Sequence, residues 1–149
     1  MTGVLGDEAN AGTTIVRPGY ELDTSRLSMW MADNVEGYAG PLVIEQFKGG
    51  QSNPTYKLVT PARNYVLRRK PPGELIAGAH AIEREARVLE ALGVPGYPVP
   101  RMHGLCTEDS VIGSWFYVMA MVEGRIFWDA TFPDVDHNER PAYFDAMNA

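Results

Sequence analysis

The stretch VIEQFKGGQSNPTYKLVTPARNYVLRR, residues 43–69, decides the fold expected for this chain. It holds three short runs that are rich in β-branched and aromatic residues, at 43–47, 55–59 and 65–68. A Gly-containing turn separates the first run from the second, and a Pro-containing turn separates the second from the third. Runs of this length between such turns predict an antiparallel β-meander.

Further elements are expected on both sides of the meander. Apolar residues at three- and four-residue spacing predict one helix over about 23–35 and another over about 77–92. Two more strands are expected at 102–105 and 116–119. This order predicts an α+β fold, in which a five-stranded antiparallel sheet has one helix inserted after its third strand and another helix before its first.

Composition and charge exclude several classes of protein. Of the 149 residues, 45% are hydrophobic and 21% are charged, which is typical of a globular domain rather than a disordered chain. The net charge of −6 argues against non-specific nucleic-acid binding. The single cysteine, Cys106, allows no internal disulfide and suits a reducing compartment. His80, His103 and His137 lack the spacing of metal ligands, so no metal site is expected.

The sequence shows no pattern typical of export or membrane insertion. Residues 1–12 have neither the basic start nor the apolar run of a signal peptide. No stretch reaches the roughly eighteen apolar residues that a membrane-spanning helix needs. We therefore expect a soluble, cytoplasmic protein with no membrane partner.

The turn between the first two strands is a candidate phosphate-binding loop. Small residues let backbone N–H groups approach a phosphate closely and form an anion-binding nest. The pattern is neither a Walker loop nor the three-glycine dinucleotide fingerprint, so a plain hairpin turn remains an alternative. The candidate residues are Gly49, Gly50, Gln51, Ser52 and Asn53.

Arg68, near the end of the third strand, is a candidate phosphate-binding cation. Alternation of side chains along a strand places Val66 and Arg68 on one face and Tyr65, Leu67 and Arg69 on the other. In kinase-like folds a cation on the third strand contacts the nucleotide phosphates and pairs with a carboxylate on the following helix. Arg69 and Lys70 are expected to face solvent, and a basic strand edge that deters aggregation is the alternative interpretation of the whole run.

Glu85 is the candidate carboxylate. At 100° per residue, with Ile82 at zero, Ala86 falls near about 40° and Leu89 near about 340°. Glu85 falls near about 300°, within the apolar side of the helix, whereas Glu83 and Glu90 fall outside it and are expected to face water. A carboxylate on a buried face needs a partner, and a cation on the adjacent strand could supply it. A carboxylate that reaches water at the edge of that face is the alternative.

The apolar strand at 116–119 continues into a Gly-ended segment that could contact an adenine. Met119 would lie behind the base, and Ala120, Met121 and Val122 would run along its edge and offer backbone N–H and C=O groups. An ordinary core strand has the same pattern.

Taken in order, these motifs resemble the phosphotransferase family that includes aminoglycoside and choline kinases. The order is the Gly-rich turn, the Val66-Leu67-Arg68 strand, the Glu85-to-Leu89 helix, Pro98-Val99-Pro100-Arg101 and the segment at 116–124. Within the family, residues 50–56, 65–73 and 111–127 most resemble the kinase-like domains fused to, or encoded beside, acyl-CoA dehydrogenases. The resemblance covers roughly 23–149.

The resemblance implies a protein-kinase-like fold with ATP held between two lobes. Residues 1–22 would be a flexible tail, 23–124 the amino-terminal lobe, and 125–149 a connector and the truncated start of the second lobe, with a helix from Asp136 or Asn138. The Gly49–Asn53 turn would cover the phosphates, Arg68 would replace a phosphate-contacting lysine, and Glu85 would be its helix partner. Residues 120–122 would form the adenine-facing hinge.

The family's catalytic aspartate and its Mg²⁺ ligands lie in downstream segments that this sequence does not contain. The resemblance therefore predicts a parent enzyme that moves the γ-phosphate of ATP to a hydroxyl of a small molecule, with Mg²⁺. This chain would supply the ATP-binding lobe, hold no catalytic residue and be inactive alone.

A nucleotide-sensing or protein-interaction module is the alternative function. An exposed lobe face carrying Trp128, Phe132, Tyr143 and Phe144 could then mediate self-association. The identity of the acceptor is not encoded in these motifs, although the dehydrogenase-associated branch hints at a hydroxyacyl substrate.

Overall fold

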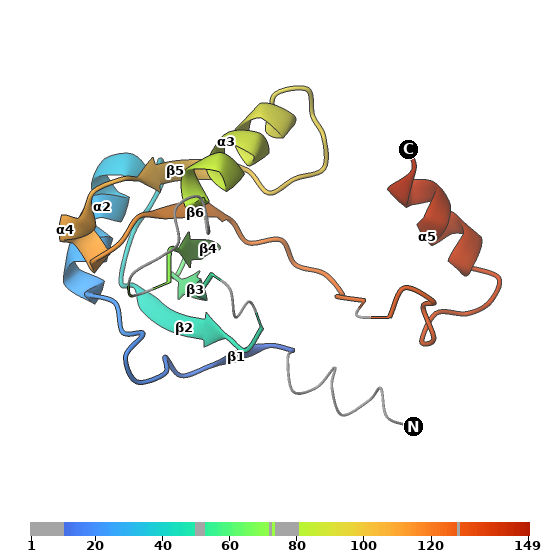
Figure 1. Ribbon diagram of the computed structural model, residues 1–149, viewed down its shortest axis with the longest axis horizontal. Helices are drawn as coiled ribbons and strands as arrows, with labels where there is room; N and C mark the ends of the chain where they lie inside the picture. Colours follow the sequence, from blue (N-terminus) through green and yellow to red (C-terminus); the bar gives the residue numbers. More distant parts are fainter. Residues whose placement is uncertain (1–10, 50–52, 72, 74–80, 128) are drawn as a thin grey trace.

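The structure is a computed structural model and describes residues 11–49, 53–71, 73, 81–127 and 129–149. Its central feature is an antiparallel sheet of six strands in the order β1-β2-β3-β4-β6-β5 (Figure 1). The strands are β1 (Thr13–Thr14), β2 (Val43–Phe47), β3 (Thr55–Val59), β4 (Asn64–Arg69), β5 (Met102–Cys106) and β6 (Phe116–Ala120).

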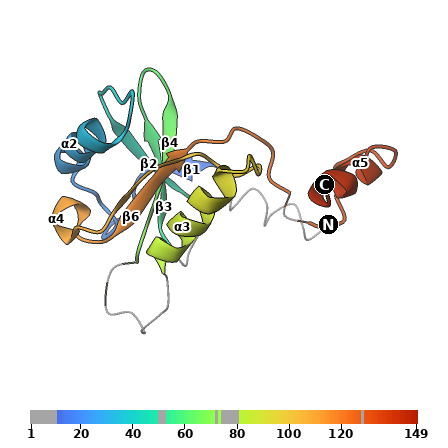
Figure 2. The same cartoon turned by 90° about the horizontal axis from the view of Figure 1, so that it is seen from above.

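Four helices accompany the sheet in the described part of the chain. They are α2 (Thr24–Asn34), α3 (Ile82–Gly93), the single turn α4 (Asp109–Ile112) and α5 (Arg140–Met147). Seen from above, α2 and α3 lie on opposite sides of the sheet (Figure 2). The predicted α+β fold, with a helix before the meander and another inserted after it, is therefore confirmed.

Period-two alternation along the strands builds a separate core on each face of the sheet. On one face, Leu58, Leu67 and Phe116 pack with α2 residues such as Leu27 and Met31. On the other face, the intervening residues pack with α3 in a smaller cluster of Ile82, Ala86 and Tyr117, flanked by Leu89, Met102, Leu105 and Met119. The smaller cluster belongs to the face that also carries Arg68.

The chain order of the last two strands differs from their order in space. β6 pairs with β4, with Arg68 opposite Tyr117 and Val66 opposite Met119, and β5 lies outside β6. The chain therefore returns from α3 to the edge of the sheet before it enters the centre. This order brings Tyr117 and Met119 of β6 beside Arg68 and Val66 of β4.

Two expectations about these elements differ from the structure, and part of a third falls outside the described residues. The sheet has a sixth strand, because Thr13 and Thr14 pair with Phe47 and Gln46 of β2. Two threonines carry no apolar alternation, so sequence patterns do not reveal this strand. Helix α3 is described from Ile82, and residues 77–80 of the predicted helix lie outside the described residues.

The last helix, α5, also begins later than predicted, at Arg140. Asp136 instead closes a turn, since its carboxylate accepts a hydrogen bond from the N–H of Asn138 at 2.9 Å. Figure 1 shows that α5 and the segment leading to it lie apart from the sheet. Aromatic side chains hold this segment together, with ring-centroid distances of 4.9 to 5.6 Å among Phe127, Phe132, Tyr143 and Phe144.

Among the described residues, no helix combines the length and apolar character needed to cross a membrane.

Candidate functional site

Arg68 and Glu85 form an ion pair between β4 and α3. The Nε atom of Arg68 lies 3.1 Å from Oε2 of Glu85, and its Nη2 atom lies 3.5 Å from Oε1. The side chains are 33% and 37% exposed, so the pair lies at the margin of the core rather than inside it. The predicted partner of Glu85, a cation on the adjacent strand, is therefore present.

Two further side chains donate hydrogen bonds to the same carboxylate. The amide Nδ2 of Asn53 lies 3.3 Å from Oε1 of Glu85. The hydroxyl of Tyr117 lies 3.1 Å from Oε2. Asn53 and Tyr117 are 3% and 2% exposed, so both bring polar groups into the margin of the core.

Local structure explains why these four residues meet. Burial of Ile82 and Ala86 seats the first turns of α3 on the sheet and turns Glu85 toward β4. Arg68 and Tyr117 are cross-strand partners on β4 and β6, so their side chains emerge side by side on the α3 face. Asn53 reaches the carboxylate from the segment that enters β3.

Tyr117 is a candidate site residue that sequence reasoning missed. Alternation along 116–119 puts Tyr117 and Met119 on one face, and this signal was in the sequence. The pairing of that strand with β4 was not, because strand order depends on contacts far apart in the chain. Burial, and then the negative charge of Glu85, raises the pKa of Tyr117, so its hydroxyl stays protonated and acts as a donor at neutral pH.

The neighbouring basic residues differ from expectation. Arg69 is 6% exposed rather than solvated, because alternation carries it to the α2 face beside Tyr56. Lys70 lies 3.5 Å from Glu83 and 4.0 Å from the ring centroid of Trp115. Glu83, predicted to face water, thus forms a second link between the start of α3 and the end of β4, and its pKa is lowered by backbone hydrogen bonding and by Lys70.

Of the predicted phosphate-binding turn, only the two ends are described. Gly49 follows β2 and is partly buried, and Asn53 is buried beside Glu85. Gly50, Gln51 and Ser52 lie outside the described residues.

The predicted adenine-facing segment leaves the sheet at the end of β6. Met119 is partly buried against the cluster formed by Ile82, Ala86 and Tyr117. Two of the backbone N–H groups already have partners, since Ala120 donates to the carbonyl of Arg101 at 2.8 Å and Met121 donates to that of Asn64 at 3.4 Å.

Val122 differs from its two neighbours in the adenine-facing segment. Its side chain is 63% exposed, and its N–H has no protein partner among the described residues. Val122 therefore offers the first free backbone donor after β6.

Within the described ranges, no three His, Cys, Asp or Glu side chains converge as a metal site would require.

Comparison with known proteins agrees with this geometry. Residues 43–149 match the sequence model of the phosphotransferase enzyme family. The chain belongs to this family. The resemblance seen in the sequence is therefore confirmed at the level of the family.

The chain is also similar to part of two much longer proteins, which are named for a different activity. It is 42% identical over 135 residues to acyl-CoA dehydrogenase family member 11 of Homo sapiens. This alignment covers 88% of the chain and 17% of the relative. It is 39% identical over 150 residues to the Arabidopsis thaliana protein named "Probable acyl-CoA dehydrogenase IBR3". This alignment covers 95% of the chain and 18% of the relative. The chain thus spans less than a fifth of the length of these relatives.

A solved structure shares the fold. The crystal structure from Ralstonia eutropha that carries the name "putative aminoglycoside phosphotransferase" aligns with a TM-score of 0.74 at 50% identity. The alignment covers 86% of this chain and 36% of that one. The kinase-like fold expected from the sequence is therefore present.

Proposed function

We propose that this chain is the ATP-binding lobe of a small-molecule phosphotransferase. The observation that carries the proposal is the Arg68–Glu85 ion pair on the α3 face, 3.1 Å across. A cation held in this way supports binding of the nucleotide's phosphates, because the carboxylate orients the guanidinium. Arginine can also donate two parallel hydrogen bonds to phosphate oxygens.

The remaining predicted residues would hold the other parts of ATP. The turn from Gly49 to Asn53 would approach the phosphates with its backbone N–H groups. Met119 would support the adenine, and the free N–H of Val122 would donate to its edge, while Ala120 and Met121 remain tied to the sheet. The three sets would surround one nucleotide on the α3 face.

The reaction of the parent enzyme would be transfer of the γ-phosphate of ATP to a hydroxyl of a small molecule. The described residues do not fit a Mg²⁺ site, so no step is assigned to magnesium in this chain, and its ligands are proposed to lie in other segments of the enzyme. We accordingly expect no phosphoryl transfer by this chain alone. A cytoplasmic location and a hydroxyl-bearing small molecule as acceptor are parts of the same proposal.

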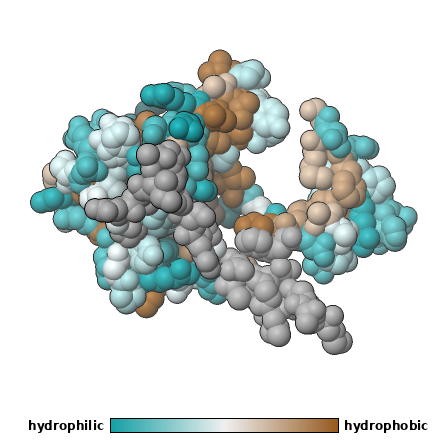
Figure 3. Space-filling model, viewed as in Figure 1, coloured by the Kyte–Doolittle hydropathy of each residue, from teal (hydrophilic) through white to brown (hydrophobic). Residues whose placement is uncertain are grey.

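One observation favours a second candidate function, an interaction module. Figure 3 shows apolar surface beside α3 and on the carboxyl-terminal segment, on either side of an open hollow. Large hydrophobic side chains are exposed in both places, among them Val94 at 86%, Tyr97 at 55% and Phe144 at 44%. Apolar surface of this kind is typical of a site covered by another protein or by a second copy.

Titration with ATP, followed by two-dimensional ¹⁵N NMR of the chain, tests the primary proposal and detects even millimolar affinity. We expect the signals of the Val122 N–H and the Arg68 Nε–H to shift on addition of ATP. Arg68→Ala should weaken binding by about tenfold or more, because a charge-assisted contact to phosphate is lost. Arg87→Ala, an exposed cation on the outer side of α3, is the matched control and should bind as wild type.

Equal ATP affinity in the wild type and in Arg68→Ala would contradict the site. Signal shifts confined to residues outside the α3 face would contradict it as well.

A further inference from the structure

The carboxylate of Glu85 receives contacts from three separate parts of the sheet side of the site. Arg68 reaches it from β4, Tyr117 from β6, and Asn53 from the segment entering β3. Oε1 accepts from Asn53 and Arg68, and Oε2 accepts from Tyr117 and lies beside the Nε atom of Arg68. Each oxygen thus has one neutral donor and one cationic neighbour.

The two neutral donors are much better fixed than the ion pair itself. Tyr117 and Asn53 are almost fully buried, whereas Arg68 and Glu85 each keep about a third of their side-chain surface exposed. A partly exposed ion pair is held weakly on its own, because water competes for both charges and two long side chains must be ordered. Burial removes that freedom from the tyrosine and the asparagine.

Tyr117 is well suited to hold a carboxylate in one orientation. Its ring is part of the cluster that seats α3, and its backbone is paired directly with that of Arg68. A protonated phenol has one hydrogen to donate, and at 3.1 Å the carboxylate accepts it. Since burial and the charge of Glu85 both raise the pKa of Tyr117, this donor is retained across the physiological pH range.

We infer that Tyr117 and Asn53 are positioning residues, which hold Glu85, and through it Arg68, in the geometry that receives phosphate before a nucleotide binds. The contacts with Asn53 and Tyr117 would thus join α3 to the segment entering β3 and to β6, as well as to β4. The last step of this inference, the benefit to nucleotide binding, rests on the function proposed above, whereas the positioning of Arg68 does not.

Tyr117→Phe tests the positioning directly, because it removes the hydroxyl and leaves the ring in the cluster. Tyr65→Phe is the matched control, since Tyr65 is fully buried, lies on the opposite face of the sheet, and has a hydroxyl with no hydrogen-bond partner among the described residues. The readout is hydrogen exchange of the Arg68 Nε–H, assigned by its loss in Arg68→Lys. This Nε atom is buried 3.1 Å from Oε2 of Glu85 and has no hydrogen-bond partner of good geometry among the described residues, so exchange of its proton reports access of water to the ion pair.

We expect the Arg68 Nε–H to exchange about fivefold faster or more in Tyr117→Phe, since a hydrogen bond to a charged group is lost. The control, Tyr65→Phe, should exchange at the wild-type rate. Equal exchange in the wild type and in Tyr117→Phe would overturn the inference. Equal acceleration in both tyrosine variants would also overturn it, because it would trace the effect to general loosening of the sheet.

A double-mutant cycle with Glu85→Gln separates positioning from a direct role of Tyr117. If Tyr117 acts through Glu85, Tyr117→Phe should weaken ATP binding by about five- to tenfold in the wild type and much less in the Glu85→Gln background. Fully additive effects would contradict positioning. If ATP fails to bind the wild type, the proposed function fails, but the exchange experiment still decides whether Tyr117 holds Arg68.

Discussion

At the scale of single residues, Val122 is the first residue after β6 whose backbone N–H has no partner among the described residues. Ala120 and Met121 use their N–H groups within the fold, whereas the N–H of Val122 is available. Val122→Pro removes this donor, and Val122→Ala keeps it while trimming the exposed side chain. We expect Val122→Pro to lower ATP affinity by about tenfold and Val122→Ala to change it little.

This comparison can be made by the same NMR titration as for Arg68. Equal affinities in Val122→Pro and Val122→Ala would show that adenine recognition does not use this N–H group.

The positions of single residues also show how much of the candidate site could be predicted from sequence patterns. The 3.6-residue period placed Glu85 on the apolar side of its helix, and the 2-residue period placed Arg68 on the strand face that meets it. Both side chains meet in the structure. The same alternation put Arg69 on the opposite face, and its burial there shows that charge alone is a poor guide to exposure.

At the scale of elements, Asp23 caps the amino-terminal end of helix α2. The carboxylate of Asp23 accepts a hydrogen bond from the N–H of Arg26 at 2.9 Å. Because α2 buries Leu27 and Met31 in the larger core, loss of the cap should lower the stability of that whole face. We expect Asp23→Ala to reduce the free energy of unfolding by about 1 kcal/mol.

Urea unfolding of the purified chain measures this effect. Asp33→Ala, an exposed change in the last turn of α2, is the control and should be neutral or slightly stabilising, because a negative charge near a helix carboxyl end is unfavourable. An equal loss of stability in both variants would argue against the cap.

The strands of the sheet could be predicted from the sequence, but their order could be predicted only in part. The meander β2-β3-β4 follows from local turns and alternation, and it was predicted with the correct strands. The placement of β6 between β4 and β5 was not predicted, since a free sheet edge accepts either strand on local grounds. The Tyr117–Glu85 contact depends on that placement, which is why Tyr117 escaped sequence reasoning.

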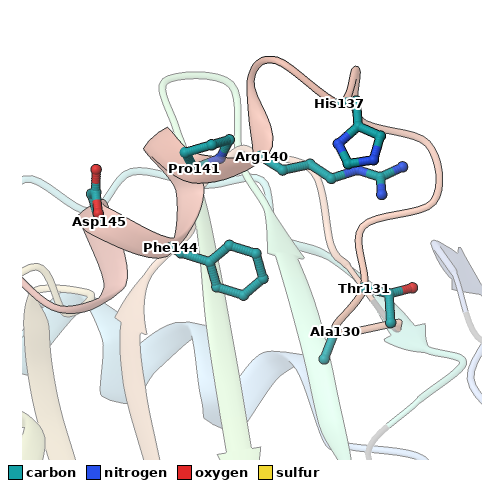
Figure 4. A pocket seen from close by; sticks show the side chains of 7 residues that line it. All are labelled: Ala130, Thr131, His137, Arg140, Pro141, Phe144 and Asp145. Carbon is teal, nitrogen blue, oxygen red and sulfur yellow. The ribbon is translucent and has the colours of Figure 1, made fainter.

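At the scale of the whole molecule, the carboxyl-terminal segment carries its own aromatic cluster and a shallow pocket. Ala130, Thr131, His137, Arg140, Pro141, Phe144 and Asp145 line this pocket, and Figure 4 shows the ring of Phe144 between α5 and the loop at 130–131. The pocket lies on the segment that Figure 1 shows apart from the sheet, whereas the Arg68–Glu85 pair joins β4 and α3. It is thus a candidate contact surface rather than part of the proposed nucleotide site.

Phe144→Gln tests the proposed self-association, because it replaces an exposed ring of this segment with a polar side chain. We expect the dimer dissociation constant, measured by sedimentation velocity, to rise by about tenfold on loss of buried aromatic area. Val43→Thr is the control, since Val43 is 55% exposed on a distant strand. A wild-type chain that stays monomeric at high micromolar concentration, or a Phe144→Gln variant that associates as strongly, would contradict this surface.

The sequence by itself determined the elements and the faces of their side chains. Backbone geometry imposes periods of 2 and 3.6 residues, and these periods can be read without knowing the partner of any segment. The α+β class, the meander and the opposed positions of Arg68 and Glu85 therefore followed from the residues alone.

Only the tertiary structure decided which strands are neighbours and how the charged groups are satisfied. The insertion of β6 beside β4, the added strand β1, the Lys70–Glu83 pair and the Tyr117 hydroxyl on Glu85 all join segments distant in the chain. Such contacts arise when packing of the two cores brings the elements together, and no local pattern specifies them.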